Sequence, residues 1–312
     1  MLVFYSIDDP TLSLDASVVT LGNFDGIHLG HQALVAQTVE EARRRKAASV
    51  VVTFDPHPLK VLAPDRAPRL ILTAEDKISM LGELGVDVVV SQRFDRSFAN
   101  LRAEEFVQRS IVDRLKTKKM FVGRDLQFGH ARRGNVELLV DWGAALGFEV
   151  SIVEPILING ARVSSSRIRR LLEAGRVDEA RASLGRYHFI SGTVIPGSRR
   201  GRQIGFPTAN IASRTEVVPG DGIYATLFHV ENKWWPSASS IGVNPTFGAG
   251  PRTIESYILD FDRDIYDESI KLAFVEKIRE EQKFSDVPAL VAQIQDDLKV
   301  TRSLFHRLGA IS

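Results

Sequence analysis

Hydrophobic and polar residues alternate in two different ways along the chain. Up to about residue 184, short apolar runs typical of buried strands are separated by segments in which apolar residues recur at helical spacing. The expected strands span 17–21, 48–54, 86–91, 120–123 and 149–153, and the expected helices span 31–45, 74–84, 103–115 and 136–146. Strands that alternate with helices predict a parallel sheet covered by helices.

The pattern changes after residue 184. Strand-like segments bounded by turn residues follow one another at 187–195, 222–230, 234–242, 253–260 and 269–276, and a helical pattern returns at about residue 287. Such a series predicts a closed antiparallel β-barrel with an appended helix. We therefore expect an α/β protein of two domains, residues 1–184 and residues 185–312.

Composition narrows the classes of partner. The 312 residues are 44% hydrophobic and 25% charged, and 40 basic residues oppose 39 acidic ones, for a net charge of +1. This balance gives no reason to expect binding to nucleic acid or to a membrane. The chain has no cysteine and no apolar run that could cross a bilayer, and Asp8 and Asp9 interrupt the place of a signal sequence's apolar core. We expect a cytoplasmic protein.

A glycine-rich segment joins the first expected strand to the first expected helix. Its residues are Gly22, Asn23, Phe24, Asp25, Gly26, Ile27, His28, Leu29, Gly30 and His31. Such a junction exposes backbone N–H groups and the positive end of the helix dipole, which attract phosphate. His28 and His31 could donate hydrogen bonds to a phosphoryl oxygen and stabilise charge there. A metal site is the alternative interpretation of the two histidines, but zinc would need further ligands.

A second polar cluster precedes a helix that is expected to end near residue 175. Ser164 and Ser166 suit a helix start, because hydroxyl groups cap free N–H groups, and capping alone is the alternative interpretation. Arg167 and Arg169 in the first turn oppose the usual preference for acidic residues there, which indicates that an anion binds. Guanidinium groups beside exposed amides suit a triphosphate or a departing pyrophosphate.

The barrel half has its own glycine-rich and basic segment, which runs from residue 197 to residue 210. It contains Gly197, Arg202 and Gly205, and it ends with Thr208 and Asn210 on the same side of an extended strand. Hydroxyl and amide oxygens are acceptable ligands of Mg²⁺.

Together these motifs resemble the prokaryotic bifunctional riboflavin kinase and FMN adenylyltransferase family, also called FAD synthetases. Residues 20–31 are similar to its GxFDGxHxGH signature, residues 163–170 to its ISSTRIR motif with Ser166 in place of threonine, and residues 207–210 to its PTAN motif. The resemblance covers about residues 15–300. It implies a Rossmann-like nucleotidyltransferase domain followed by a riboflavin kinase barrel.

For the first domain the resemblance implies catalytic roles for His28, His31 and Arg169. The implied ATP-binding residues are Gly22, Phe24, Asp25, Gly26, His28, His31, Ser164, Ser166 and Arg169. The implied flavin crevice contains Asp55, His57, Asp125 and Phe128. The attacking FMN phosphate is already an anion, so this transfer needs no general base; positioning and charge stabilisation, with Mg²⁺ on the phosphates, would suffice.

In the barrel the acceptor would be an alcohol, the terminal ribityl hydroxyl of riboflavin, so a base must take its proton. Glu255 occupies the family's acidic position and is the expected catalytic base. The other residues implied for ATP, Mg²⁺ and flavin are Gly197, Arg202, Gly205, Thr208, Asn210, Tyr224, Asn244 and Arg279, with Thr208 and Asn210 as metal ligands.

Two activities are therefore expected: riboflavin plus ATP gives FMN in the barrel, and FMN plus ATP gives FAD and pyrophosphate in the first domain. The alternatives are a single-activity enzyme with one decayed site and a flavin-binding regulator. Both sites keep their expected residues, which argues against a decayed site. A regulator would need neither a base nor ligands for a leaving group, so the same residues also argue against that alternative. Small molecules are the expected partners; a homo-oligomer and transfer of flavin to apo-flavoproteins stay open.

Overall fold

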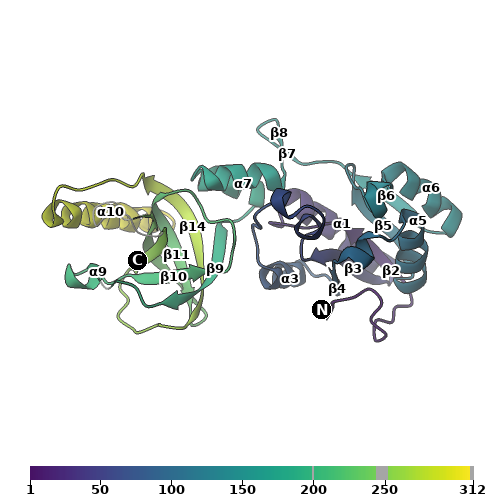
Figure 1. Ribbon diagram of the computed structural model, residues 1–312, viewed down its shortest axis with the longest axis horizontal. Helices are drawn as coiled ribbons and strands as arrows, with labels where there is room; N and C mark the ends of the chain where they lie inside the picture. The colour runs from purple at the N-terminus through teal and green to yellow at the C-terminus, as the bar shows by residue number, and fades with distance from the viewer. Residues whose placement is uncertain (199, 244–251, 310–312) are drawn as a thin grey trace. The chain divides into compact units, whose positions relative to one another are not determined.

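The computed structural model describes residues 1–198, 200–243 and 252–309. The chain forms two compact units, one of residues 1–69 and 74–164 and the other of residues 70–73 and 165–312 (Figure 1). Asn244 lies outside the described residues. Within the described part of the chain, no helix has both the length and the apolar character needed to cross a membrane.

A six-stranded parallel sheet forms the centre of the first unit. Its strands are β1 (Leu2–Phe4), β2 (Ser17–Leu21), β3 (Ala48–Asp55), β4 (Val88–Arg93), β5 (Thr117–Gly123) and β6 (Glu149–Val153), in the order β1-β4-β3-β2-β5-β6. The central strands are almost entirely buried, as both faces of a parallel sheet usually are. The predicted parallel sheet is confirmed.

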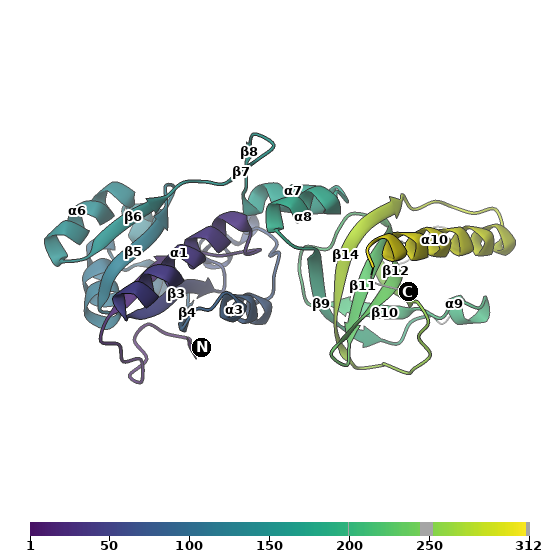
Figure 2. The ribbon, with the colours of Figure 1, turned by 180° about the vertical axis from the view of Figure 1, so that it is seen from behind.

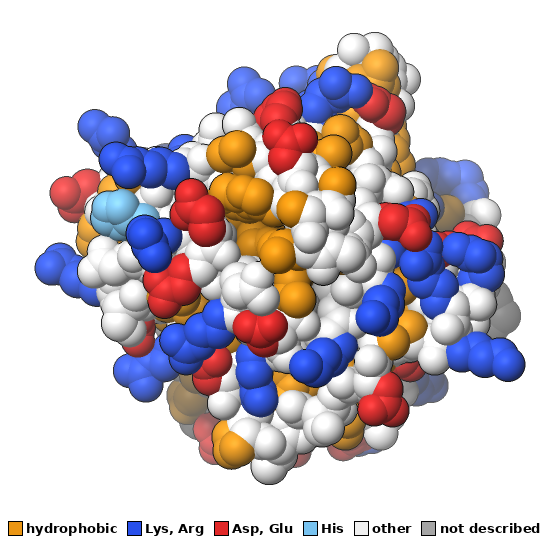
Figure 3. All heavy atoms as spheres, turned by 90° about the vertical axis from the view of Figure 1, so that its right-hand side faces the viewer, with side chains coloured by type: hydrophobic (Ala, Val, Ile, Leu, Met, Phe, Trp, Pro, Cys, Tyr) orange, Lys and Arg blue, Asp and Glu red, His pale blue; other side chains and the backbone are white. Residues whose placement is uncertain are grey.

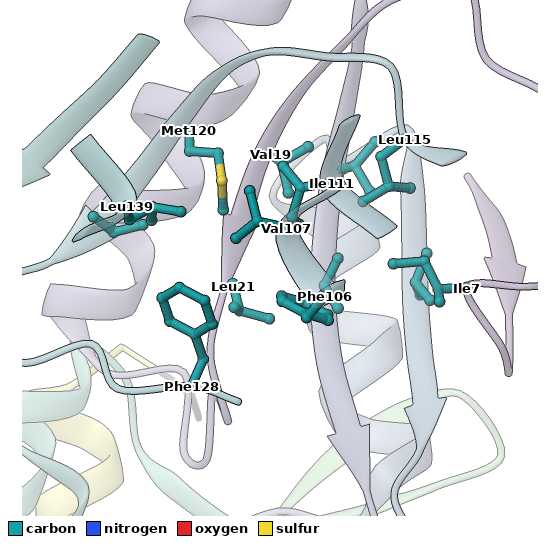
Figure 4. Packing of buried hydrophobic residues seen from close by; sticks show 14 of the residues in the cluster. Ile7, Val19, Leu21, Phe106, Val107, Ile111, Leu115, Met120, Phe128 and Leu139 are labelled. Atoms are coloured by element: carbon teal, nitrogen blue, oxygen red, sulfur yellow. The ribbon is translucent and has the colours of Figure 1, made fainter. Parts of the chain in front are cut away.

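Helices of this unit surround the sheet. They are α1 (Leu29–Arg45), α2 (Pro58–Leu62), α3 (Ala74–Glu83), α4 (Arg96–Ala99), α5 (Ala103–Glu105), the π-helix η2 (Phe106–Arg114), α6 (Val136–Leu146) and the 3₁₀ turns η1 (Pro64–Arg66) and η3 (His130–Arg132). Figure 4 shows how Leu21, Phe106, Met120 and Leu139 converge from sheet and helices on one apolar core. A short hairpin of β7 (Leu157–Ile158) and β8 (Ala161–Arg162) follows.

One face of the first unit has an apolar area near its middle, with charged side chains around it (Figure 3). On α6 and on β6, the last strand of the sheet, Leu138, Val140, Leu146 and Ile152 are 36–42% exposed. Helix α6 and the last strand of the sheet therefore carry partly uncovered hydrophobic side chains.

The second unit is a closed antiparallel barrel, as predicted. Its strands are β9 (His188–Ile195), β10 (Ala209–Ser213), β11 (Gly222–Val230), β12 (Lys233–Gly242), β13 (Thr253–Ile258) and β14 (Ser269–Arg279), in the order β10-β13-β12-β11-β14-β9. Its helices are α7 (Ser165–Glu173), α8 (Val177–Leu184), α9 (Arg200–Gln203) and α10 (Val287–Arg307). Helix α10 packs along β11, β12 and β14 (Figure 2), where Ala225, Val275 and Phe305 form a small core.

The two units are joined by more than one passage of the chain. The chain passes from one unit to the other after residues 69, 73 and 164. In the barrel unit, the N–H group of Leu70 donates to Oε2 of Glu216 at 2.7 Å, and the carbonyl group of Leu70 accepts from the N–H group of Val217 at 3.0 Å. Helices α7 and α8 belong to this unit, although the sequence placed the domain boundary after residue 184.

Candidate active sites

The glycine-rich loop of the first unit lies between the end of β2 and α1 and has a strained backbone. Phe24 and Ile27 have positive φ angles of 49° and 37°, which L side chains rarely adopt. Phe24 is 1% exposed, and a Cβ added at Gly22 would lie 3.3 Å from its ring. Such strain persists where the surroundings fix the backbone, and it is common at ligand sites.

His28 is the N-cap of α1. Its Nδ1 accepts a hydrogen bond from the backbone N–H group of His31 at 3.3 Å, so the neutral ring has its proton on Nε2 and can donate from there. The rings of His28 and His31 stack, with centroids 3.6 Å apart and planes at 15°. The structure therefore brings the two predicted histidines together at a helix N-terminus, which favours an anion.

His31 stays neutral in this environment. Burial lowers its pKa well below the usual value of 6.5, and electrostatic interactions with His28 and with the ammonium group of Lys77 lower it further. Its Nδ1 is buried, with no hydrogen-bond partner among the described residues. A neutral imidazole can donate one hydrogen bond without the cost of holding a buried charge.

Sequence reasoning missed Lys77, which lies on α3 and is 9% exposed. Its Nζ donates to Oγ1 of Thr53 at 3.0 Å and to the carbonyl oxygens of Phe54 at 3.2 Å and Asn23 at 3.4 Å. No motif marked this residue, because a lysine in an amphipathic helix usually lies on the solvent face.

Two residues of the expected flavin crevice lie at the end of β3 and just after it. Asp55 is the exposed last residue of the strand. His57 is the N-cap of α2, and its Nδ1 accepts a hydrogen bond from the N–H group of Leu59 at 3.2 Å. Capping thus accounts for one ring nitrogen of His57, and its role toward flavin remains a prediction.

The other two crevice residues follow β5 and have different surroundings. Asp125 is exposed and forms an ion pair of 2.8 Å with Arg162 of β8. Phe128 is 9% exposed and belongs to the core (Figure 4). Its ring centroid is 5.9 Å from that of Phe106 and 6.3 Å from that of Trp142. Phe128 therefore supports the loop by packing.

Ser166 and Arg169 lie on α7 in the barrel unit, whereas Ser164 is the last residue of the first unit. Ser166 is exposed, and Ser164 and Arg169 are half-buried. The first turn of α7, which is described throughout, has no acidic residue, so its own side chains do not neutralise the positive end of the dipole.

In the barrel unit, a mostly apolar cavity lies between α10 and the outer face of the strands. The strand residues that line it include Ile223, Ala238, Ser240, Glu255 and Tyr257, and the lining residues of α10 are Leu290, Ile294, Asp297 and Leu298. Residues at the alternate strand positions, such as Thr226 and Ser237, are buried inside the barrel, and their hydroxyl groups are hydrogen-bonded to each other at 2.7 Å. The alternation of β-strands thus places one set of side chains inside the barrel, where Tyr224, Phe228 and Phe274 are fully buried, and the other set on the cavity wall outside it.

Three predicted residues meet beside this cavity. Oγ1 of Thr208 donates to Oε2 of Glu255 at 3.1 Å, and Oγ1 of Thr253 lies 3.4 Å from Oε1 of the same carboxylate. Asn210 is the direct cross-strand neighbour of Glu255, so their side chains share one face. A Cβ added at Gly197 would lie 2.1 Å from Nδ2 of Asn210, so only glycine allows this approach.

The oxygen atoms of Thr208, Asn210 and Glu255 suit Mg²⁺, which prefers oxygen ligands and keeps places for substrate phosphates. Glu255 is the one carboxylate of this set, and the described parts of the chain contain no group of three or more His, Cys, Asp or Glu side chains arranged to hold a metal. The predicted donor set therefore fits the ion.

Arg279, which was predicted to cover the flavin, lines the cavity. Its Nε and Nη2 donate to the two carboxylate oxygens of Asp297 at 2.9 and 2.8 Å. Asp297 is 5% exposed, and Nε2 of Gln293 donates to its Oδ1 at 3.0 Å. The guanidinium group is thus held in a fixed orientation by α10.

The remaining kinase residues are placed differently. Tyr224 is fully buried inside the barrel, its hydroxyl group donates to the carbonyl oxygen of Gly220 at 2.6 Å, and burial raises its pKa. The cavity wall at this point of β11 is its neighbour Ile223. Arg202 and Gly205 are exposed around the end of α9.

Comparison with known proteins assigns a flavin enzyme to each part of the chain. The chain matches the family model for FAD synthetase over residues 11–167 and the family model for riboflavin kinase over residues 184–305. The bifunctional riboflavin kinase/FMN adenylyltransferases of Escherichia coli K12 and Listeria monocytogenes are each 38% identical to it, over 292 and 294 residues that cover 93% of both chains compared.

A solved structure described as a macrolide-efflux protein from Streptococcus pneumoniae has the same two-part fold. It is 32% identical, has a TM-score of 0.85 and covers 96% of this chain and 98% of its own. Efflux is the description of that protein alone, whereas both family models and the curated relatives concern flavin enzymes. The chain therefore belongs to the bifunctional riboflavin kinase/FMN adenylyltransferase family, with FMN adenylyltransferase in its N-terminal part and riboflavin kinase in its C-terminal part.

Proposed function

We propose that the two activities use separate sites. Riboflavin is phosphorylated beside the Thr208–Glu255 pair, and FMN is adenylylated at the loop that contains His28 and His31. The observation that carries the proposal is the 3.1 Å contact between Thr208 and Glu255, which places a carboxylate next to a hydroxyl at the rim of an apolar cavity.

In the kinase reaction, Glu255 accepts the proton of the terminal ribityl hydroxyl of riboflavin as its oxygen bonds to the γ-phosphorus of ATP. The bond from the γ-phosphorus to the bridging oxygen breaks, and ADP leaves. The apolar wall between the strands and α10 suits the isoalloxazine ring, and Arg279 is held at its edge by Asp297.

Mg²⁺ would be held at Thr208 and Asn210, and it would neutralise charge on the ATP phosphates when bound. Gly197 permits the amide of Asn210 to lie where it does. The chain's own contribution is thus the orientation of oxygen ligands around the base.

In the adenylyltransferase reaction, a phosphate oxygen of FMN bonds to the α-phosphorus of ATP, and pyrophosphate leaves. We assign His28 and the neutral His31 as hydrogen-bond donors to the ATP phosphates, because neither needs to take a proton from an acceptor that is already ionised. Ser164, Ser166 and Arg169 would bind the leaving pyrophosphate, with Arg169 as the cation.

Further proposals concern the whole protein. The boundary between the two functions lies after residue 184. The protein works in the cytoplasm, because a chain without cysteine suits a reducing compartment. It also passes flavin to apo-flavoproteins. The partly exposed apolar side chains of α6 and β6 support a homo-oligomer.

The test is to incubate the purified chain with riboflavin, ATP and MgCl₂ and to separate the flavins by chromatography. FMN and FAD should both form. Glu255→Gln should lower FMN formation by roughly 100-fold or more and still convert supplied FMN to FAD. His28→Ala and Arg169→Ala should lose FAD formation and keep FMN formation.

Kinase turnover within a few-fold of the parent in Glu255→Gln would show that Glu255 is not the base. Flavin binding by the parent without either product would favour the regulator. Formation of one product alone would favour the single-activity enzyme.

A further inference from the structure

A lysine is almost fully buried beneath the loop that precedes α1. Lys77 of α3 is 9% exposed. Removing an ammonium group from water is strongly unfavourable unless acceptors and opposite charges replace the water. The neighbours of Lys77 supply both.

The hydrogen bonds of Lys77 join segments that are far apart in the sequence. Its ammonium group donates to Oγ1 of Thr53 and the carbonyl oxygen of Phe54 in β3, and to the carbonyl oxygen of Asn23 in the glycine-rich loop. Oγ1 of Thr53 also donates to Asn23, at 3.1 Å. An ammonium group has three donors, so three acceptors match its capacity. One side chain thus ties the loop to the end of the neighbouring strand.

Charged groups of the same site surround this ammonium. Burial lowers the pKa of Lys77 from its usual value, and the carboxylates of Asp25, which is 6% exposed, and Asp55 partly offset this effect. Burial lowers the pKa of His31, and electrostatic interactions with His28 and Lys77 lower it further. Removal of the lysine charge would therefore loosen the attachment of the loop to β3 and raise the pKa of His31.

We propose that Lys77 is a positioning residue for FMN adenylyl transfer, whose ammonium group holds the loop of Asn23 and Asp25 on the end of β3 and so fixes His28 and His31. The inference rests on the proposed use of this loop for ATP. Lys77 acts through the loop and has no part in the kinase reaction.

The experiment measures both activities in the full chain, with ATP and MgCl₂, for the parent, Lys77→Met and Lys77→Arg. Lys77→Met keeps the apolar stem and removes the charge; its kcat for FAD formation should fall roughly tenfold or more. The acidic limb of its pH–rate profile should move to higher pH, because loss of the neighbouring positive charge raises the pKa of His31. Lys77→Arg keeps the charge and should regain part of the rate and the parent's pH limb.

Two controls separate positioning from loss of folding. Lys118→Met, at an exposed lysine of β5, should leave both activities unchanged. In chains that also carry Trp234→Phe and Trp235→Phe, the fluorescence of Trp142 reports whether the first unit is folded in each variant. FMN formation in the barrel should stay within twofold of the parent.

Unchanged FAD formation in Lys77→Met would overturn the inference. Equal loss of FAD formation in Lys77→Met and Lys77→Arg, without a shift of the pH profile, would also overturn it in favour of a structural role. Loss of FAD formation together with the Trp142 fluorescence of an unfolded chain would do the same. Absence of FAD formation in the parent, or FAD formation at the parent's rate in His28→Ala, would instead contradict the proposed function.

Discussion

His188 shows what the burial of a single titratable group does to the barrel. Its ring is fully buried, stacks on Phe274 at a centroid distance of 6.1 Å, and has Nε2 3.0 Å from the carbonyl oxygen of Val217. Burial lowers the pKa of His188 to about 3, and the charge of Arg186 acts in the same direction.

Because this pKa is lowered on folding, the unfolded chain binds a proton at His188 below about pH 6.5, whereas the folded chain does so near pH 3. The contribution of His188 to the free energy of unfolding is therefore fully present above pH 6.5 and is lost as the pH falls toward 3. We expect His188 to lower the free energy of unfolding by about 2 kcal/mol between pH 8 and pH 5. Urea unfolding of the chain at both pH values measures this difference.

His188→Gln is the matched control, because glutamine retains a side-chain donor for Val217 and does not titrate. Its loss of stability between pH 8 and pH 5 should be smaller than that of the parent by the same amount. An equal loss in parent and variant would contradict the assigned pKa.

Single residues also show where sequence reasoning ends. Thr208 and Asn210 could be predicted to share a face, because a strand's alternation fixes which positions lie on the same side, whereas Glu255, on another strand, was predicted only from the family resemblance. Tyr224 could not be placed, since the same alternation does not say which face of β11 is the inside of the barrel. Lys77 could not be found, because its acceptors come from segments distant in sequence.

At the scale of elements, the long strands and helices of both halves were predictable from their periodicity, with ends within a few residues. The strand β1 was missed, because its three residues gain their structure from pairing with β4. The expected helix 103–115 is a short α-helix followed by the π-helix η2, a difference that apolar spacing does not reveal.

Gly197, which precedes α9, lies very close to Asn210 of β10, and this contact leads to a second prediction. Gly197→Ala would place a methyl group where the amide of Asn210 lies, at 2.1 Å from Nδ2. We expect the kcat of FMN formation to fall roughly tenfold or more while FAD formation from supplied FMN is unchanged. Initial rates with each flavin measure both.

Gly82→Ala in α3 is the control for the same change elsewhere, because its methyl group would meet only the flexible side chain of Met1, at 3.1 Å. It should leave both rates unchanged. A Gly197→Ala protein with full kinase activity would show that the position of Asn210 is not required.

At the scale of the whole molecule, residues 70–73 belong to the barrel unit although the sequence around them belongs to the other unit. Ile71 and Leu72 are 0% and 3% exposed. Burial of such side chains contributes about 1.5–3 kcal/mol each, as an upper estimate. A chain of residues 165–312 alone should therefore unfold at a lower urea concentration than the barrel in the full chain.

Trp234 and Trp235 report barrel unfolding when the full chain carries Trp142→Phe, which removes the only tryptophan of the other unit. Glu216→Ala in the full chain removes the acceptor of the Leu70 N–H group and should give a smaller shift in the same direction. A fragment as stable as the barrel of the full chain would contradict the prediction.

The short excursion at residues 70–73 also bears on the history of the chain. A protein assembled from two genes end to end can be separated again by one break, but here a break between the halves would take four residues of one half away with the other. A kinase released from this fusion would lose the hydrogen bonds that Leu70 makes with Glu216 and Val217. The fusion is therefore easier to keep than to reverse.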